Sequence, residues 1–330
     1  MLEHGGRLRA AAREFGIPLT DWLDLSTGIA PYGFDLPAIP ASAWSRLPEA
    51  EDELEAVARD YYAVSSLLAV AGSQAAIQML PRLRQQSRVG IVSPCYAEHA
   101  EAWRREGHRV SEFSEGGVAR ALDQLDVLVV VNPNNPTGRL LPPAQLLDWH
   151  ARLAERGGWL VVDEAFIDPT PEYSLAPHSD LPGLIVLRSF GKFFAMAGAR
   201  LGFVLAEAEL LRALGDALGP WPIAGPSRFV GTALLADREG QQRQRERLLV
   251  DGQRLAHLLT AHGLPPAGGG ALFQWVLSEE AGLLYEFLAC QGILVRHFYA
   301  PSSLRFGLPS DEQGWTRLAN ALAHYREMGL

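Results

Sequence analysis

Short apolar runs rich in valine, isoleucine and leucine alternate with longer amphipathic segments along the first two thirds of the chain. This pattern predicts an α/β fold with a mainly parallel central sheet sandwiched by helices, because parallel strands are buried on both faces and are therefore continuously apolar. The expected strands are 88–93, 127–131, 159–163, 184–189 and 201–205. The expected helices between them are 73–86, 96–107 and 142–156.

A different pattern begins after about residue 207. A long helical stretch, interrupted near 220–226, reaches about residue 262, and a triple-glycine turn follows at 268–270. A smaller α+β domain is then predicted by strands near 271–277, 293–296 and 303–306 and a closing helix over 310–328. The Pro/Gly-rich segment 28–48 lacks periodicity, which is typical of an extended arm that crosses to the other domain or to a partner subunit. We expect a large domain over 40–215, with 1–39 and 216–330 forming an N-terminal arm and a small C-terminal domain.

Composition excludes several classes of partner. The 330 residues show no secretory signal and no apolar run of about 18 residues, so we expect a cytoplasmic protein with no membrane partner. A net charge of −9 without a block of basic residues argues against a nucleic-acid partner. Cys95 and Cys290 can build no disulfide framework, and no metal-ligand cluster is visible. Because the net charge is negative, any anionic ligand must be held by positively charged groups and hydrogen-bond donors close to it.

Lysine is almost missing from the chain. Of the 29 basic residues, 28 are arginine and only Lys192 is lysine. Arginine stays protonated in proteins, whereas a desolvated lysine amine can lose its proton and attack a carbonyl. Lys192 is therefore a candidate for a Schiff base with an aldehyde cofactor, although a lone lysine can also result from compositional drift.

A pyridoxal-type cofactor also needs an acid for its pyridine nitrogen and an aromatic ring to stack on. Asp163 ends a predicted buried strand, and a carboxylate at the C-terminal end of a parallel strand points into the crevice where such sheets bind ligands. It is the candidate acid, with a turn or helix cap as the alternative. Tyr96 is the best placed aromatic residue, although a tyrosine at a helix start more often serves simple packing.

The sequence Asn-Pro-Asn-Asn-Pro-Thr-Gly at 132–138 directly follows another predicted strand. Its prolines and glycine fix a rigid turn from which Asn135 can donate a hydrogen bond to the cofactor's phenolic oxygen. Asn-Pro pairs alone are common in turns, but the seven-residue combination is much more specific.

Donors for the cofactor phosphate are expected from two regions. Gly72, Ser73 and Gln74 lie where a short apolar run gives way to a helix, so backbone N–H groups and a hydroxyl are available there. Serine is also an ordinary helix N-cap, so this signal is weak alone. Ser189 and Arg200, which flank the lysine in the sequence, could complete the phosphate site, with a surface or interdomain ion pair as the alternative for Arg200.

In this order, the motifs resemble the aspartate aminotransferase superfamily, the fold type I pyridoxal phosphate enzymes. The matching pieces span most of the chain and are Gly72-Ser73-Gln74, Tyr96, Asn-Pro-Thr-Gly at 135–138, Asp163, Ser189-Phe190-Gly191-Lys192 and the segment from Arg200 to Gly202. The resemblance implies a fold of the transferase type, pyridoxal 5'-phosphate bound to Lys192, and a homodimer with sites at the subunit interface.

Within the superfamily the chain is similar to the threonine-phosphate decarboxylases of cobalamin biosynthesis and to the histidinol-phosphate aminotransferases. Four features favour the decarboxylases. The first two are the N-terminal His-Gly-Gly-Arg at 4–7 and the segment 25–31, where Gly28 replaces an asparagine of some relatives. The third is Phe166, where the aminotransferases have a tyrosine. The fourth is the presence of Arg296 and Arg305, which match the two C-terminal arginine positions of the family.

Two positions depart from the family pattern. Leu47 stands where relatives have a tyrosine that reaches the cofactor phosphate of the neighbouring subunit. Gly191 replaces a serine or threonine beside the lysine. Both departures concern phosphate binding rather than the identity of the family.

The resemblance implies decarboxylation of a phosphorylated amino acid, L-threonine O-3-phosphate, to (R)-1-amino-2-propanol O-2-phosphate. The alternative with the same fold is transamination of histidinol phosphate with glutamate. A cofactor-binding regulator without turnover is a third possibility, which the lack of helix-turn-helix character before the large domain disfavours.

The resemblance also implies substrate-binding residues. Arg305 is expected to hold the substrate carboxylate, with Asn135 assisting. The expected phosphate-binding residues are His4, Gly5, Gly28 and Arg296. Ordinary surface pairing is the alternative for the two arginines.

Overall fold

The computed structural model describes residues 4–49 and 52–328. The chain divides into two compact units, each with its own core. The large unit consists of Gly33–Asn135 and Leu140–Arg243, and the small unit consists of Met1–Tyr32, Pro136–Arg139 and Gln244–Leu330. Residues 33–39 and 216–243, which we expected in the arm and the small domain, therefore fall in the large unit. Residues 216–243 belong to the large unit because helix α10 (Gly225–Ala236) packs on its helix α3 (Leu54–Tyr62).

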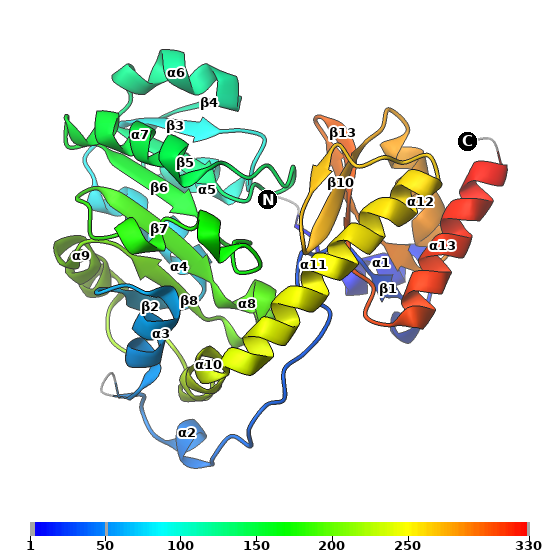
Figure 1. The fold of residues 1–330 in the computed structure, drawn as a ribbon, viewed down its shortest axis with the longest axis horizontal. Coiled ribbons are helices and arrows are strands. Elements are labelled where there is room, and N and C mark those ends of the chain that lie inside the picture. Colours follow the sequence, from blue (N-terminus) through cyan, green and yellow to red (C-terminus); the bar gives the residue numbers. More distant parts are fainter. Residues whose placement is uncertain (1–3, 50–51, 329–330) are drawn as a thin grey trace. The chain divides into compact units, whose positions relative to one another are not determined.

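A seven-stranded sheet with the order β2-β8-β7-β6-β5-β3-β4 forms the large unit (Figure 1). Its strands are β2 (Leu68–Val70), β3 (Arg88–Val92), β4 (Arg109–Phe113), β5 (Val127–Val131), β6 (Trp159–Asp163), β7 (Leu184–Ser189) and β8 (Gly202–Leu205). Among the described strands of this sheet, β8 is the one that runs in the opposite direction to the others. The predicted mainly parallel sheet is confirmed, and β5, β6 and β7 begin and end at the predicted residues.

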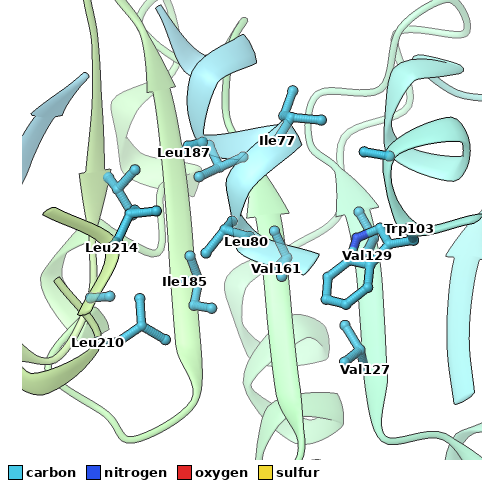
Figure 2. Packing of buried hydrophobic residues seen from close by; sticks show 14 of the residues in the cluster. Ile77, Leu80, Trp103, Val127, Val129, Val161, Ile185, Leu187, Leu210 and Leu214 are labelled. Carbon is cyan, nitrogen blue, oxygen red and sulfur yellow. The ribbon is translucent and has the colours of Figure 1, made fainter. Parts of the chain in front are cut away.

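Several helices of the large unit, among them α4 (Ser73–Met79), α5 (Glu98–Arg105), α7 (Pro143–Ala154) and α9 (Ala208–Leu218), cover the two faces of this sheet (Figure 1). The other α-helices of this unit are α2 (Ser42–Ser45), α3, α6 (Val118–Ala121), α8 (Phe190–Phe193), α10 and the start of α11 (Arg238–Ala261). On one face, Ile77 of α4, Trp103 of α5 and Leu214 of α9 pack on the inner strands (Figure 2). Successive strand side chains alternate between faces, so Leu160 and Val162 point to the opposite side, where α7 packs on β6.

An antiparallel sheet with the order β12-β13-β10-β9 forms the small unit. Its strands are β9 (Gly268–Gly269), β10 (Phe273–Leu277), β12 (Arg296–Tyr299) and β13 (Ser302–Gly307). Strand β1 (Leu23–Asp24) pairs in parallel with β11 (Ile293–Leu294). The helices are α1 (Leu8–Phe15), α12 (Ala281–Cys290), α13 (Glu312–Glu327) and the rest of α11. The predicted smaller α+β domain is therefore confirmed, with α1 and α12 as additions.

Within the described part of the chain, no helix combines the length and the apolar character that a membrane crossing requires.

The expected arm is not wholly extended. Residues 33–41 lack helix and strand, but the short helix α2 follows them and contacts α10 within the large unit.

Candidate active site

Asp163 occupies the last position of β6, and its side chain is almost fully buried. Its Oδ2 atom lies 2.9 Å from Nε2 of His99 on α5, and its Oδ1 atom accepts a hydrogen bond from the Ala165 amide at 3.1 Å. These contacts fix the carboxylate at the carboxyl end of a parallel strand, the position suited to a pyridine nitrogen. The sequence did not predict His99, although it lies only three residues after Tyr96.

Tyr96 lies beside this pair, with its ring centre 6.1 Å from that of His99 in an edge-to-face arrangement. Its hydroxyl donates to Oε1 of Gln74 at 3.0 Å, and the Gln74 amide donates to Glu98 at 2.9 Å. Burial, with the nearby carboxylates of Glu98 and Asp163, raises the pKa of Tyr96 to about 12. The structure thus brings three predicted cofactor residues, Gln74, Tyr96 and Asp163, into one region of the large unit.

The predicted phosphate-binding residues gather at the ends of β7, β8 and β2. Strand register pairs Ser189 with Gly202, and Gly202 with the last residue of β2. Gly72 has a φ of +74°, and a Cβ atom there would lie 2.9 Å from Nη2 of Arg200. A Cβ atom at Gly202 would lie 2.6 Å from the amide nitrogen of Ser73. The two glycines therefore let a backbone N–H and a guanidinium lie close together, a combination suited to a phosphate.

Lys192 lies in α8, the single helical turn that follows β7, and is half-buried. Its Nζ atom is 5.7 Å from the ring centre of Phe166, which belongs to the loop after Asp163. The departure at Gly191 has a local cause, because a Cβ atom there would lie 2.7 Å from Cα of Ala197. A serine or threonine beside the lysine would therefore require a backbone shift.

The turn at 132–138 follows β5, and Asn132 fixes it from the buried side. The Asn132 side chain accepts from the Leu141 amide at 2.7 Å and donates to the Leu141 carbonyl at 3.2 Å. The Asn132 backbone amide donates to the Asp163 carbonyl at 2.9 Å. Asn135 lies three residues further along this turn and is half-buried. The predicted rigid turn is thus anchored directly to the strand that carries Asp163.

A buried charge cluster lies next to these residues in the sequence and was not predicted. Arg188 precedes Ser189 and donates to Glu164 at 3.1 Å and to Asp168 at 2.6 Å. All three side chains are almost completely buried. Burial raises the pKa of Glu164, and Arg188 opposes that rise. The cluster connects the residue after Asp163 to the residue before Ser189, so it ties together two strand ends that carry predicted cofactor contacts.

Replacing Arg188 by methionine should lower the free energy of unfolding by about 3–5 kcal/mol, because two buried carboxylates would lose their counter-charge. The matched control is Arg88→Met, which removes an arginine whose ion pair with Asp126 is on the surface. That variant should lose under about 1 kcal/mol. Urea denaturation of both variants checks the comparison, and equal losses would contradict a special role for the cluster.

In the small unit, Arg296 and Arg305 are direct cross-strand partners on β12 and β13. Arg305 is 6% exposed, and its Nη2 atom donates to the Ser26 carbonyl at 2.9 Å. Burial, helped by the positive charge of Arg296, lowers the pKa of Arg305 to about 10. An anion bound here would offset both effects, since it would supply a counter-charge to the two guanidinium groups.

The N-terminal residues of the chain lie in the same part of the small unit. The Gly6 amide donates to the Ser26 hydroxyl at 2.8 Å, and a Cβ atom at Gly5 would collide with the Ser26 carbonyl oxygen. His4 is the adjoining residue and is exposed, and Gly28 is buried two residues after Ser26. Segments from both ends of the chain, which carry the predicted substrate residues 4, 5, 28, 296 and 305, therefore meet around Ser26.

Three comparisons place the chain among known proteins. The model of the family "Aminotransferase class I and II" matches residues 43–322. The chain is 62% identical to a threonine-phosphate decarboxylase of Pseudomonas aeruginosa over 99% of both chains, and 44% identical to one of Sinorhizobium sp over 97% of both. Among solved structures, a histidinol-phosphate aminotransferase from Sinorhizobium meliloti in complex with pyridoxal-5'-phosphate superposes with a TM-score of 0.84 at 21% identity, covering 97% of this chain and 94% of that one. The resemblance inferred from the motifs is confirmed, and the chain belongs to the class I and II aminotransferase family.

Proposed function

We propose that this enzyme decarboxylates L-threonine O-3-phosphate to (R)-1-amino-2-propanol O-2-phosphate, with pyridoxal 5'-phosphate as cofactor, in cobalamin biosynthesis. The observation that carries the proposal is the 62% identity, over 99% of both chains, to a protein named threonine-phosphate decarboxylase. The geometry supports it through the amine, acid and phosphate donors of the large unit and the paired arginines of the small unit.

The residues of the large unit fit pyridoxal phosphate. Lys192 is the one lysine of the chain, and Asp163 is a buried carboxylate at a strand end. The phosphate would be held by Ser73, Ser189 and Arg200, which lie at neighbouring strand ends with glycines between them. When bound, the cofactor supplies a conjugated ring that accepts the electron pair of whichever Cα bond stands perpendicular to it.

The reaction that occurs is therefore decided by how the protein holds the substrate. Decarboxylation requires the carboxylate to be perpendicular to the ring, and we assign this task to Arg305 with Asn135. A guanidinium matches a carboxylate with two parallel hydrogen bonds and so fixes its orientation. A guanidinium can pair with a phosphate in the same way, so we assign the substrate phosphate to Arg296. His4 and the backbone near Gly5 and Gly28 would be further donors.

Lys192 has a second task in this proposal. Decarboxylation breaks the bond between Cα and the carboxylate carbon, and Cα must then take up a proton as carbon dioxide leaves. After the substrate amine has replaced it, the Lys192 amine can hold this proton and deliver it to Cα. Arginine could not do this, because it stays protonated at neutral pH.

The decisive experiment is a carbon dioxide release assay with L-threonine O-3-phosphate in the absence of any keto acid. Release at a rate proportional to enzyme concentration supports decarboxylation. Pyridoxamine phosphate formation from histidinol phosphate, with turnover that depends on 2-oxoglutarate, would instead support the aminotransferase. Activity with neither substrate would contradict both assignments.

We also propose that the enzyme is a homodimer. Large apolar side chains lie exposed on the segment before α3 and before α10, among them Trp44 at 70% and Leu47 at 65%. Leu47 lines a groove of about 560 Å³ in the large unit, and Trp44 lies in the same segment; the lining also includes Pro40, Arg46, Asp52 and α10 residues such as Phe229. Exposed apolar side chains concentrated around a groove are typical of a protein interface, and a second copy of the chain is the proposed occupant.

The Trp44→Asp variant should weaken the dimer by about 30-fold or more, because it introduces a charge where an interface tryptophan would be buried. Sedimentation velocity over a range of concentrations measures the change. Val250→Asp is the control, because it introduces the same charge at an exposed apolar residue of α11. A wild-type protein that sediments as a monomer at micromolar concentration would overturn the proposal.

A further inference from the structure

Ser26 lies at the junction of three segments of the small unit. It is 2% exposed, its hydroxyl donates to Oδ1 of Asp24 at 2.6 Å, and its oxygen accepts the Gly6 amide at 2.8 Å. Its backbone carbonyl accepts from Arg305 at 2.9 Å. One buried serine therefore contacts both the N-terminal residues that adjoin His4 and the arginine of β13.

The direction of these hydrogen bonds is set by Asp24. Its Oδ1 atom receives the Ser26 amide at 2.9 Å as well as the hydroxyl. An ionised carboxylate only accepts hydrogen bonds, and a serine hydroxyl has a single proton, so that proton points to Asp24 and a lone pair remains for Gly6. Donation to a carboxylate also makes the hydroxyl oxygen a better acceptor. Asp24 thus helps to fix Gly6 although the two residues do not share a hydrogen bond.

The backbone around Asp24 is hydrogen-bonded to β11 and β13, and the two arginines lie on β13 and on β12, which follows β11. Strand β1 pairs in parallel with β11, which is followed after one residue by β12 and Arg296. Directly after β1, the Leu25 carbonyl accepts a hydrogen bond from the Gly307 amide at the end of β13 at 2.8 Å. Gly5 packs against the Ser26 carbonyl with no room for a side chain, so the N-terminal segment lies close to the backbone of residues 24–26.

We infer that Ser26 and Asp24 are positioning residues for the recognition of a phosphate monoester. They hold the backbone of residues 4–6 in one place beside Arg305, so that His4 and the adjacent backbone N–H groups meet the substrate in a set arrangement. Pre-organised donors bind an anion more tightly than mobile ones, because less conformational entropy is lost on binding. The inference rests on the proposed function and extends it to two residues that do not themselves contact substrate.

The first test does not depend on activity. In Ser26→Ala the Gly6 amide loses its acceptor, so its hydrogen exchange should become about tenfold faster, the change expected for the loss of one hydrogen bond. The matched control is Ser303→Ala, which removes an equally buried hydroxyl of β13 that donates to the Pro301 carbonyl at 2.8 Å. Exchange at residue 6 should not change in the control. Unchanged exchange in Ser26→Ala would overturn the inference.

The second test separates positioning from general stability. Ser26→Ala should raise KM for L-threonine O-3-phosphate about tenfold while kcat and the absorbance of the bound cofactor stay close to wild type. Faster exchange at residue 6 with an unchanged KM would also overturn the inference, because the segment would then be ordered without serving the substrate.

A replacement variant and a separate reading of a negative activity result complete the experiment. If Ser26→Ala fails to fold, Asp24→Asn replaces it, because a neutral amide oxygen is a weaker acceptor and should give the same changes to a smaller degree. If wild-type enzyme releases no carbon dioxide, the proposed function fails. The exchange experiment then still decides whether Ser26 orders the N-terminal segment.

Discussion

The Lys192→Arg variant should release no measurable carbon dioxide from L-threonine O-3-phosphate. It keeps the positive charge but removes the amine, and a guanidinium can neither form an imine with an aldehyde nor give up a proton at neutral pH. Loss of the proton transfer alone would lower the rate by about 10²–10⁴-fold. Loss of the covalent link to the cofactor should remove the remaining turnover.

Borohydride reduction of the cofactor-loaded protein, followed by peptide mass spectrometry, provides an independent readout. Label should appear on the peptide that contains Lys192 and be missing from Lys192→Arg. The double variant Lys192→Arg/Arg88→Lys is the control, because it restores one lysine at the exposed start of β3. Label on residue 88, or turnover in this variant, would show that any lysine suffices and would contradict the assignment.

The sequence predicted the inner strands well for a physical reason. Strands β5, β6 and β7 are buried on both faces, so each is an unbroken apolar run that stops where a polar side chain is needed at its carboxyl end. Strand β4 was missed because it lies at the sheet edge and its residues, Arg-Val-Ser-Glu-Phe, are largely solvent-accessible. Helix α12 was missed because its apolar sequence lacks the alternation with polar residues on which the helix prediction depended.

The division of the chain into units was harder to predict. The change of sequence pattern near residue 207 coincides with the start of α9, but the units divide at Arg243, inside the 24-residue helix α11. A helix that continues without interruption carries no local signal of a boundary. Only the packing of α9 and α10 on helices of the large unit, which involves contacts between distant parts of the sequence, assigns them to that unit.

The same distinction applies to the candidate site. Residues that belong to short motifs, such as Asp163 and Lys192, were predicted because their roles follow from neighbours in the sequence. His99 and Ser26 were not, because each acts through a partner in another segment: His99 is 64 residues from Asp163, and Ser26 is 20 residues from Gly6. Residues that fix the site thus become visible only when tertiary contacts are known.

Arg305→Ala should abolish most turnover while the cofactor still binds with normal absorbance. If the guanidinium holds the substrate carboxylate with two charge-assisted hydrogen bonds, each contributing about 1.5–3 kcal/mol, kcat/KM should fall at least about 10²-fold. Steady-state carbon dioxide release and the visible spectrum of the same samples measure the two properties. Arg326→Ala removes an exposed arginine of α13 in the same unit and should retain wild-type activity.

The stability of Arg305→Ala separates binding from folding. Burial and the neighbouring charge of Arg296 both disfavour the charged form of Arg305 and lower its pKa. The substitution removes the hydrogen bond to the Ser26 carbonyl, which contributes about 1 kcal/mol to the free energy of unfolding, and also the contact of Arg305 with the Phe273 ring. Activity should therefore collapse even at temperatures well below the melting temperature of the variant, and added guanidinium ion should restore part of the rate. If most activity remained in the folded variant, the carboxylate would have to be held by another group.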